Sequence, residues 1–168
     1  SSDETRQFWP KTIGYKFRMS NVQAALGLAQ VERATELVDD KRHTFERYWS
    51  SIQASTVLKK HIRLNPLSDA RHEHAYWMTT AIIEHLPSIN RDEIIAAFQN
   101  EKIDARVFFW PLSSLDFFKS APTPQAHRCS RFGLNLPSPY GIETQDIKRV
   151  CDTLEKCIMT HSENVMDL

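Results

Sequence analysis

The sequence predicts an α+β domain in which a small, mostly antiparallel sheet packs against helices, with one long helix near the N-terminus. Segments of helical periodicity lie at both ends, and short aromatic or β-branched runs lie between them. The length of 168 residues is about that of one domain with a single core. These observations favour helices and strands that share one core.

The long helix is predicted to begin at a capping box. Ser20 and Gln23 have the spacing at which each side chain bonds the other's backbone amide. The first three turns, from Val22 to Val31, are apolar round most of the circumference, so we expect them to be buried on several sides. An unbroken helix to Ile52 would be roughly 50 Å long at about 1.5 Å per residue. Since that exceeds a small domain's diameter, we expect it to bend, break or bridge two bodies.

Three short segments in the middle of the chain are predicted strands. "HIRLNP" ends at a proline, "AYWMTTAII" (residues 75–83) is apolar on both faces, and "DARVFFWPL" also ends at a proline. A strand that is apolar on both faces suits the centre of a sheet. Between the last two segments, Asn90 with Glu93 caps an amphipathic helix over "RDEIIAAFQNE".

The C-terminal third is predicted to hold two more helices. "PTPQAHRCSRFG" is typical of a short helix entered through Pro124 and closed by Gly133, and "LNLPSPYGIE" is interpreted as a loop. Thr144 is the predicted cap of the last helix. The apolar residues on the inner face of that helix are Ile147, Val150, Cys151, Leu154 and Ile158.

The predicted organisation has three parts. Residues 1–18 form a connecting segment from a missing large domain, 19–161 a single domain, and 162–168 a flexible tail. The chain begins without Met, and its first dozen residues show no clear period. We therefore expect it to be a fragment.

Composition excludes several function classes. Lys plus Arg number 21 and Asp plus Glu number 21, so no net field attracts nucleic acid or an anionic membrane. No apolar run reaches the roughly 20 residues of a bilayer crossing, and the polar start is unlike a secretory signal. The 3 cysteines lack CxxC spacing, which argues against a disulfide framework and a structural zinc site. We expect a cytoplasmic protein without nucleic-acid or membrane partners.

Few motifs carry chemistry by their residues alone. His72 and His74 are spaced to share a metal, but a solvated loop is the favoured interpretation because no third ligand is near. Ser113 and Ser114 follow an apolar strand without a glycine-flanked elbow, which favours turn or cap serines. Cys151 is interpreted as a small core residue.

Two groups of side chains suggest binding. Trp77 and the run from Phe108 to Trp110 have the chemistry of a stacking platform for a base or sugar, although we favour core positions in such apolar strands. Lys16 and Arg18 stand just before a helix N-terminus, where free amides and the helix dipole favour an anion. A solvated pair at the helix entry remains the favoured alternative for these two residues.

Several blocks of sequence resemble a known family. "GYKFRMSNVQAALGLAQVER" resembles the stretch that follows the lysine-bearing domain in DegT/StrS-type sugar aminotransferases. "AYWM", "RDEIIAAFQNEKIDARVFFWPLSSL" and "GLNLPSP…TQDIKRVCDTL" continue the resemblance in the same order. Several independent blocks in register are more specific than one short motif.

The resemblance implies the C-terminal, smaller domain of a fold-type I aminotransferase. Such enzymes use pyridoxal 5'-phosphate to aminate a keto group on a nucleotide-linked sugar, with an amino-acid donor, and are typically homodimers. They serve polysaccharide, lipopolysaccharide or glycosylated-metabolite biosynthesis. The chain matches no family motif for the Schiff-base lysine. We therefore expect no catalytic residue and no bound cofactor in this chain alone.

The resemblance also assigns three site residues. Lys16 stands at the family's asparagine that reaches the cofactor phosphate of the neighbouring subunit, and a point charge on a flexible stem replaces the amide there. Arg18 matches the family's arginine and is expected at the mouth of the active site. Ser113 stands where many members have a histidine near the substrate. No metal ligand is implied.

Two functional classes remain open. The chain is either the C-terminal part of a nucleotide-sugar aminotransferase or a stand-alone domain that dimerises or binds a partner through the helix beginning at Ser20. A dehydrating family member is a weaker third option, since the residue that distinguishes it would replace the absent lysine.

Overall fold

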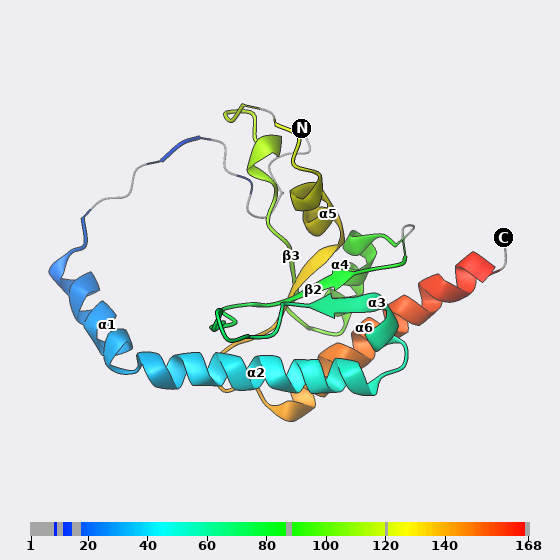
Figure 1. Cartoon of the computed structure of the whole chain (residues 1–168), viewed down its shortest axis with the longest axis horizontal. Helices are drawn as coiled ribbons and strands as arrows, with labels where there is room; N and C mark the ends of the chain where they lie inside the picture. Colours follow the sequence, from blue (N-terminus) through cyan, green and yellow to red (C-terminus); the bar gives the residue numbers. More distant parts are fainter. Residues whose placement is uncertain (1–8, 10–11, 15–17, 87–88, 120, 167–168) are drawn as a thin grey trace.

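The computed structural model describes residues 9, 12–14, 18–86, 89–119 and 121–166. The helices are α1 (Asn21–Glu32), α2 (Ala34–Ala54), α3 (Leu58–His61), α4 (Arg91–Asn100), α5 (Pro124–Phe132), α6 (Thr144–Met166) and the 3₁₀ turn η1 (Leu112–Ser114). The strands are β1 (Ile62–Leu64), β2 (Thr79–Ile83), β3 (Arg106–Val107) and β4 (Gly133–Leu136). The predicted α+β class is confirmed (Figure 1).

The strands form one sheet in the order β1-β2-β4-β3, and every neighbouring pair is antiparallel. β2 lies in the interior of the sheet, as its two apolar faces predicted, with Ile83 opposite Ile62 and Thr79 opposite Leu136. The predicted loop at residues 134–136 is wrong, because these residues form β4 between β2 and β3. The strand was missed because the polar Asn135 interrupts its apolar pattern. Asn135 is tolerated inside the sheet because its side-chain amide donates a hydrogen bond to the Val107 carbonyl.

The main core lies between the sheet and helices α2, α4 and α6. Tyr48 of α2 is fully buried, and its hydroxyl donates to the Pro137 carbonyl at 2.7 Å. The predicted inner face of the last helix is buried, and burial raises the pKa of the Cys151 thiol to about 12. In Figure 1, α5 lies above the sheet and α2 lies below it.

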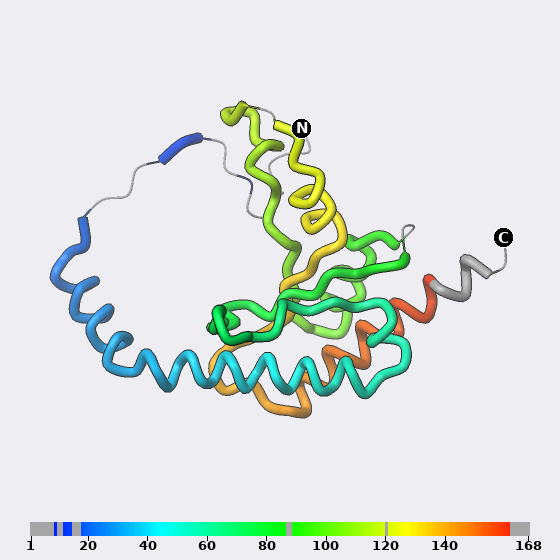
Figure 2. The backbone as a smooth tube through the Cα atoms, in the orientation of Figure 1, coloured from blue at the N-terminus to red at the C-terminus, as the bar shows by residue number. Residues whose placement is uncertain are grey.

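The N-terminal helix breaks at Arg33, so α1 and α2 run in different directions (Figure 2). Contacts with the first turn of α2 fix the position of Arg33. Arg33 pairs with Glu36 at 2.6 Å, and Tyr140 donates a hydrogen bond to the same carboxylate. The hydrogen bond from Arg33 is the main cause of the lowered pKa of Glu36, which is about 2. The expectation that so long a helix must bend or break is confirmed.

The predicted burial of α1 is wrong for this chain, because no residue of α1 is buried. The apolar pattern indicates that another segment or another molecule should cover this helix, but none of the described residues covers it. At the other end, α6 continues to Met166, beyond the boundary predicted at 161.

Candidate functional site

The segment that carries the predicted anion site leads directly into α1. Ser20 caps the helix as predicted: its hydroxyl accepts from the Gln23 amide at 3.3 Å, and the Gln23 side chain accepts from the Ser20 amide at 2.8 Å. Arg18 lies exposed just before this cap. Lys16 lies outside the described residues. The capped helix thus presents Arg18 to solvent beside its positive end.

α1 exposes large apolar side chains on more than one side. Val22 is 71% exposed, Leu26 65% and Val31 70%. Isolated helices shorter than about 12–15 residues are marginal in water, and an exposed apolar surface of this kind marks an interaction site. The exposed apolar side chains of α1 therefore favour contact with another apolar surface.

Ser113 lies in η1, at the end of the segment that leaves β3. Its Oγ is 2.6 Å from Thr123 Oγ1 and 3.3 Å from His127 Nε2, so it joins η1 to the start of α5. Ser114 donates its backbone amide to the Pro111 carbonyl at 2.9 Å, which is the turn role predicted for this pair.

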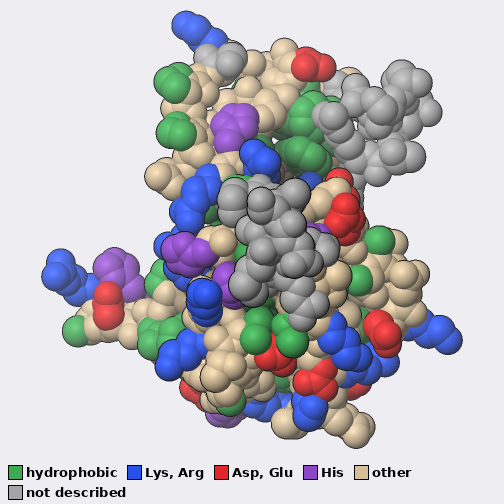
Figure 3. Space-filling model, turned by 90° about the vertical axis from the view of Figure 1, so that its right-hand side faces the viewer, with side chains coloured by type: hydrophobic (Ala, Val, Ile, Leu, Met, Phe, Trp, Pro, Cys, Tyr) green, Lys and Arg blue, Asp and Glu red, His purple; other side chains and the backbone are tan. Residues whose placement is uncertain are grey.

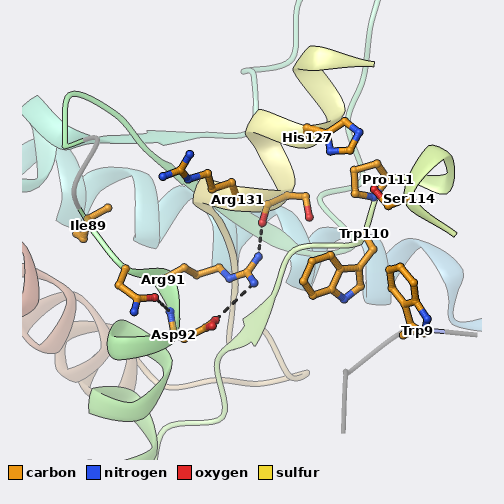
Figure 4. A pocket seen from close by; sticks show the side chains of 11 residues that line it. Trp9, Ile89, Arg91, Asp92, Trp110, Pro111, Ser114, His127 and Arg131 are labelled. Atoms are coloured by element: carbon orange, nitrogen blue, oxygen red, sulfur yellow. Dashed lines mark hydrogen bonds and ion pairs between the residues drawn. The ribbon is translucent and has the colours of Figure 1, made fainter. Parts of the chain in front are cut away.

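Ser114, the neighbour of Ser113, lines a cavity of about 640 Å³ (Figure 4). The start of α4, the segment after β3 and α5 form its walls, and Trp9 closes one end. The rings of Trp9 and Trp110 meet edge to face with centroids 5.8 Å apart. The lining residues include Asn90, Arg91, Asp92, Trp110, His127 and Arg131. Neither Arg18 nor Ser113 is among them, so the structure does not bring these two predicted site residues to one cavity within this chain.

Two of the predicted aromatic core positions are wrong. Trp77 and Phe109 were predicted to lie in the core, but they are 69% and 39% exposed. Their rings instead stack on each other with centroids 6.5 Å apart. Trp77 precedes β2 and Phe109 follows β3, so neither residue lies in a strand of the sheet. Of the two histidines considered for a metal, His72 instead contacts the Asp69 carboxylate through Nδ1 at 3.1 Å.

The lysines bear on whether the chain can hold pyridoxal phosphate. A Schiff-base lysine needs a reactive amine and an enclosed site for the ring and phosphate. Lys41 donates to the Ser138 carbonyl, and Lys148 pairs with Asp152 at 2.5 Å. The other described lysines are exposed: Lys59, Lys60, Lys102, Lys119 and Lys156. The described residues therefore do not by themselves fit the cofactor.

Two residues of the cavity escaped the sequence interpretation. Arg91 is the first residue of α4, where the helix dipole disfavours a cation. A basic residue at this position could have been noticed in the sequence as a candidate for a special role. His127 gave no such signal, because its contact with Ser113 depends on how η1 and α5 pack.

One face of the molecule shows how the charged side chains are distributed. On the face drawn in Figure 3, basic and acidic side chains are interspersed over the lower half. Among the described helices, none combines the length and hydropathy of a membrane-crossing segment.

Residues 1–155 match the DegT/DnrJ/EryC1/StrS aminotransferase family. The chain belongs to this family. The match extends from before α1 into α6, so α1, the sheet and the cavity all lie within the family region.

The chain is similar to GDP-perosamine synthases of two bacteria. It is 29% identical over 154 residues to that of Vibrio cholerae, covering 89% of this chain and 40% of the relative. It is 30% identical over 162 residues to that of Caulobacter vibrioides, covering 94% of this chain and 42% of the relative. The chain therefore spans less than half the length of these relatives.

Solved structures share the fold. A protein of Streptococcus pneumoniae described as a sugar aminotransferase, in its PLP form, superposes with a TM-score of 0.75 at 21% identity, over 89% of this chain and 38% of that one. The structure of DesI in the presence of its TDP-sugar product superposes with a TM-score of 0.72 at 24% identity, over 89% and 38%. The resemblance to the smaller domain of a fold-type I aminotransferase is thus confirmed at the level of fold.

Proposed function

We propose that this chain is the C-terminal part of a pyridoxal-phosphate-dependent aminotransferase that aminates a keto sugar on a nucleotide carrier. The reaction would serve polysaccharide, lipopolysaccharide or glycosylated-metabolite biosynthesis. The observation that carries the proposal is the family match over residues 1–155, together with relatives named GDP-perosamine synthase that extend well beyond this chain.

The exposed α1 supports a homodimer of the longer protein. Its apolar side chains need cover, and its small residues, among them Ala24, Ala25 and Gly27, let another helix approach closely. The break at Arg33 carries α1 away from the sheet. In this arrangement the segment before α1 accompanies the helix into a shared interface, where it can reach the partner's cofactor.

Each site residue has a proposed task. The cofactor, held by the rest of the enzyme, supplies the electron sink for amino transfer. Arg18, exposed beside the helix N-terminus, contacts the anionic part of the nucleotide sugar at the mouth of the active site. Lys16 contributes a charge to the cofactor phosphate of the neighbouring subunit. Ser113, held by Thr123, lies near the substrate.

The test uses the full-length protein from the native source. We expect a dimer that shows the visible absorbance of a Schiff base and transfers an amino group to a nucleotide-linked keto sugar. Replacing Arg18 with Ala should raise the KM for the nucleotide sugar about tenfold, the cost of one charged hydrogen bond. The matched control Arg149→Ala removes an exposed arginine on α6 and should leave KM unchanged. Lys16→Ala should weaken cofactor binding.

The alternative is a stand-alone domain that dimerises or binds a partner without catalysis, which α1 also favours. The intact mass of the native polypeptide separates the two. A native mass of 19.5 kDa would rule out the aminotransferase in favour of this alternative. A cytoplasmic location is part of the proposal, since Cys129, Cys151 and Cys157 are all free thiols.

A further inference from the structure

Arg91 is a cation whose side chain is largely buried, in an unfavourable position. Its side chain is 10% exposed, and it is the first residue of α4, where the helix dipole opposes positive charge. Burying a charge is costly unless the charged group is paired and hydrogen-bonded. The contacts around Arg91 should therefore compensate both costs.

The protein compensates only in part. One terminal nitrogen, Nη1, donates to the Ser130 carbonyl, and the guanidinium lies over the Trp110 ring, 5.4 Å from its centroid. Within the described part of the chain, the other terminal nitrogen, Nη2, contacts only Asp92, at 3.5 Å, and that carboxylate is 76% exposed. A bond of that length to a solvated carboxylate is weak.

The Nε–H of Arg91 has no hydrogen-bond partner among the residues that the structure describes. Nε and Nη2 form one edge of the guanidinium, the edge that binds two oxygens of a carboxylate or phosphate side by side. Arg91 lines the cavity described above, and Figure 4 shows its guanidinium extending toward Trp110. This edge, on which Nη2 has only the long contact with Asp92 among the described residues, thus belongs to the wall of a cavity large enough for a ligand.

The other residues that line the cavity favour binding of a doubly charged anion. Among the lining residues that the structure describes, Arg91 and Arg131 are permanently cationic, and Asp92 is the acid. The side chains of Ser114 and His127 add polar groups, and the Trp9 and Trp110 rings add a flat apolar surface. From this arrangement we infer that the cavity between α4 and α5 binds a phosphate group through the Nε–Nη2 edge of Arg91.

The phosphate has two sources that share this chemistry: free inorganic phosphate, and the phosphate of a larger ligand whose ring stacks on Trp110. The inference does not rest on the proposed function, because it concerns groups within this chain and needs neither cofactor nor amino transfer.

The experiment follows the Arg91 Nε–H signal by ¹⁵N NMR in the 168-residue chain. Inorganic phosphate, GDP and guanosine are titrated separately, with sodium chloride at matched ionic strength as the blank. We expect phosphate and GDP, but not guanosine or the blank, to shift that signal. Tighter binding of GDP than of phosphate identifies a nucleotide as the ligand, and equal binding identifies the phosphate group alone.

Two variants and a control complete the test. Arg91→Gln should weaken phosphate binding at least about tenfold, the loss expected for a charged bidentate contact. Arg91→Lys keeps the charge that supports folding but loses the planar edge, and should weaken binding similarly. Arg128→Gln, on the same helix as the cavity wall but paired with Glu84 outside it, should leave binding unchanged. A stationary Nε–H signal with both phosphate and GDP, or equal losses in Arg91→Gln and Arg128→Gln, would overturn the inference.

Discussion

Gly133 stands directly against Phe108. A Cβ added at Gly133 would lie 2.8 Å from Phe108 Cβ, closer than side-chain carbons approach in proteins. Gly133 ends α5 and begins β4, and Phe108 follows β3, so the close approach fixes how the wall of the cavity joins the sheet.

Replacing Gly133 with Ala should therefore destabilise the fold. Overpacking of this kind costs about 1–3 kcal/mol, which corresponds to a fall in Tm of roughly 2–4 °C per kcal/mol for a domain of this size. Thermal unfolding measures the change. The matched control is Gly27→Ala, since a Cβ at Gly27 meets nothing within 4 Å and alanine favours the helix. The added Cβ would also meet the Cys129 carbonyl of α5, so an unchanged Tm for Gly133→Ala would contradict the close packing at this position.

Lys102 holds a left-handed backbone with φ of 57° just after α4. A side chain in that conformation costs about 1–2 kcal/mol relative to glycine. Lys102→Gly should relieve this strain. Because glycine also has more freedom in the unfolded chain, which offsets part of the gain, we expect the free energy of unfolding to rise by only up to about 1 kcal/mol. Urea denaturation measures the change. Lys102→Ala removes the charge but keeps the Cβ, and an equal gain in that variant would assign the effect to charge instead of backbone strain.

Glu93 and His161 join α4 to α6, with Glu93 Oε2 2.9 Å from His161 Nε2. The hydrogen bond to the Cys157 carbonyl, and then Glu93, raise the pKa of His161. Because the folded state holds this proton more tightly, its stabilisation is complete below the unfolded pKa of about 6.5 and is lost as pH rises through the raised value. Glu93→Gln should thus destabilise the protein more at pH 5.5 than at pH 8.5.

Urea denaturation at several pH values measures this difference, and NMR titration of His161 measures its pKa directly. The double variant with His161→Gln isolates the pair from the effect of Glu93 on the helix dipole. A coupling energy that is constant with pH would contradict the assigned role of the proton.

Local sequence determined the elements whose signals are short-range. The Ser20 capping box, the Asn90 cap, the proline entry to α5 and the inner face of α6 were predicted, because each depends on residues within one or two turns. β4 was missed, since its place between β2 and β3 depends on pairing with strands far along the chain.

The candidate site divides in the same way. The sequence by itself determined the family, through blocks that keep their order, and it placed Arg18 before a capped helix. Only the tertiary structure decided that no residue of α1 is buried, that Ser113 meets His127, and that Arg91 Nε lines a cavity without a hydrogen-bond partner among the described residues. Local pattern predicts which faces should be buried. What buries them, and which polar groups remain unpaired, depends on contacts between distant segments.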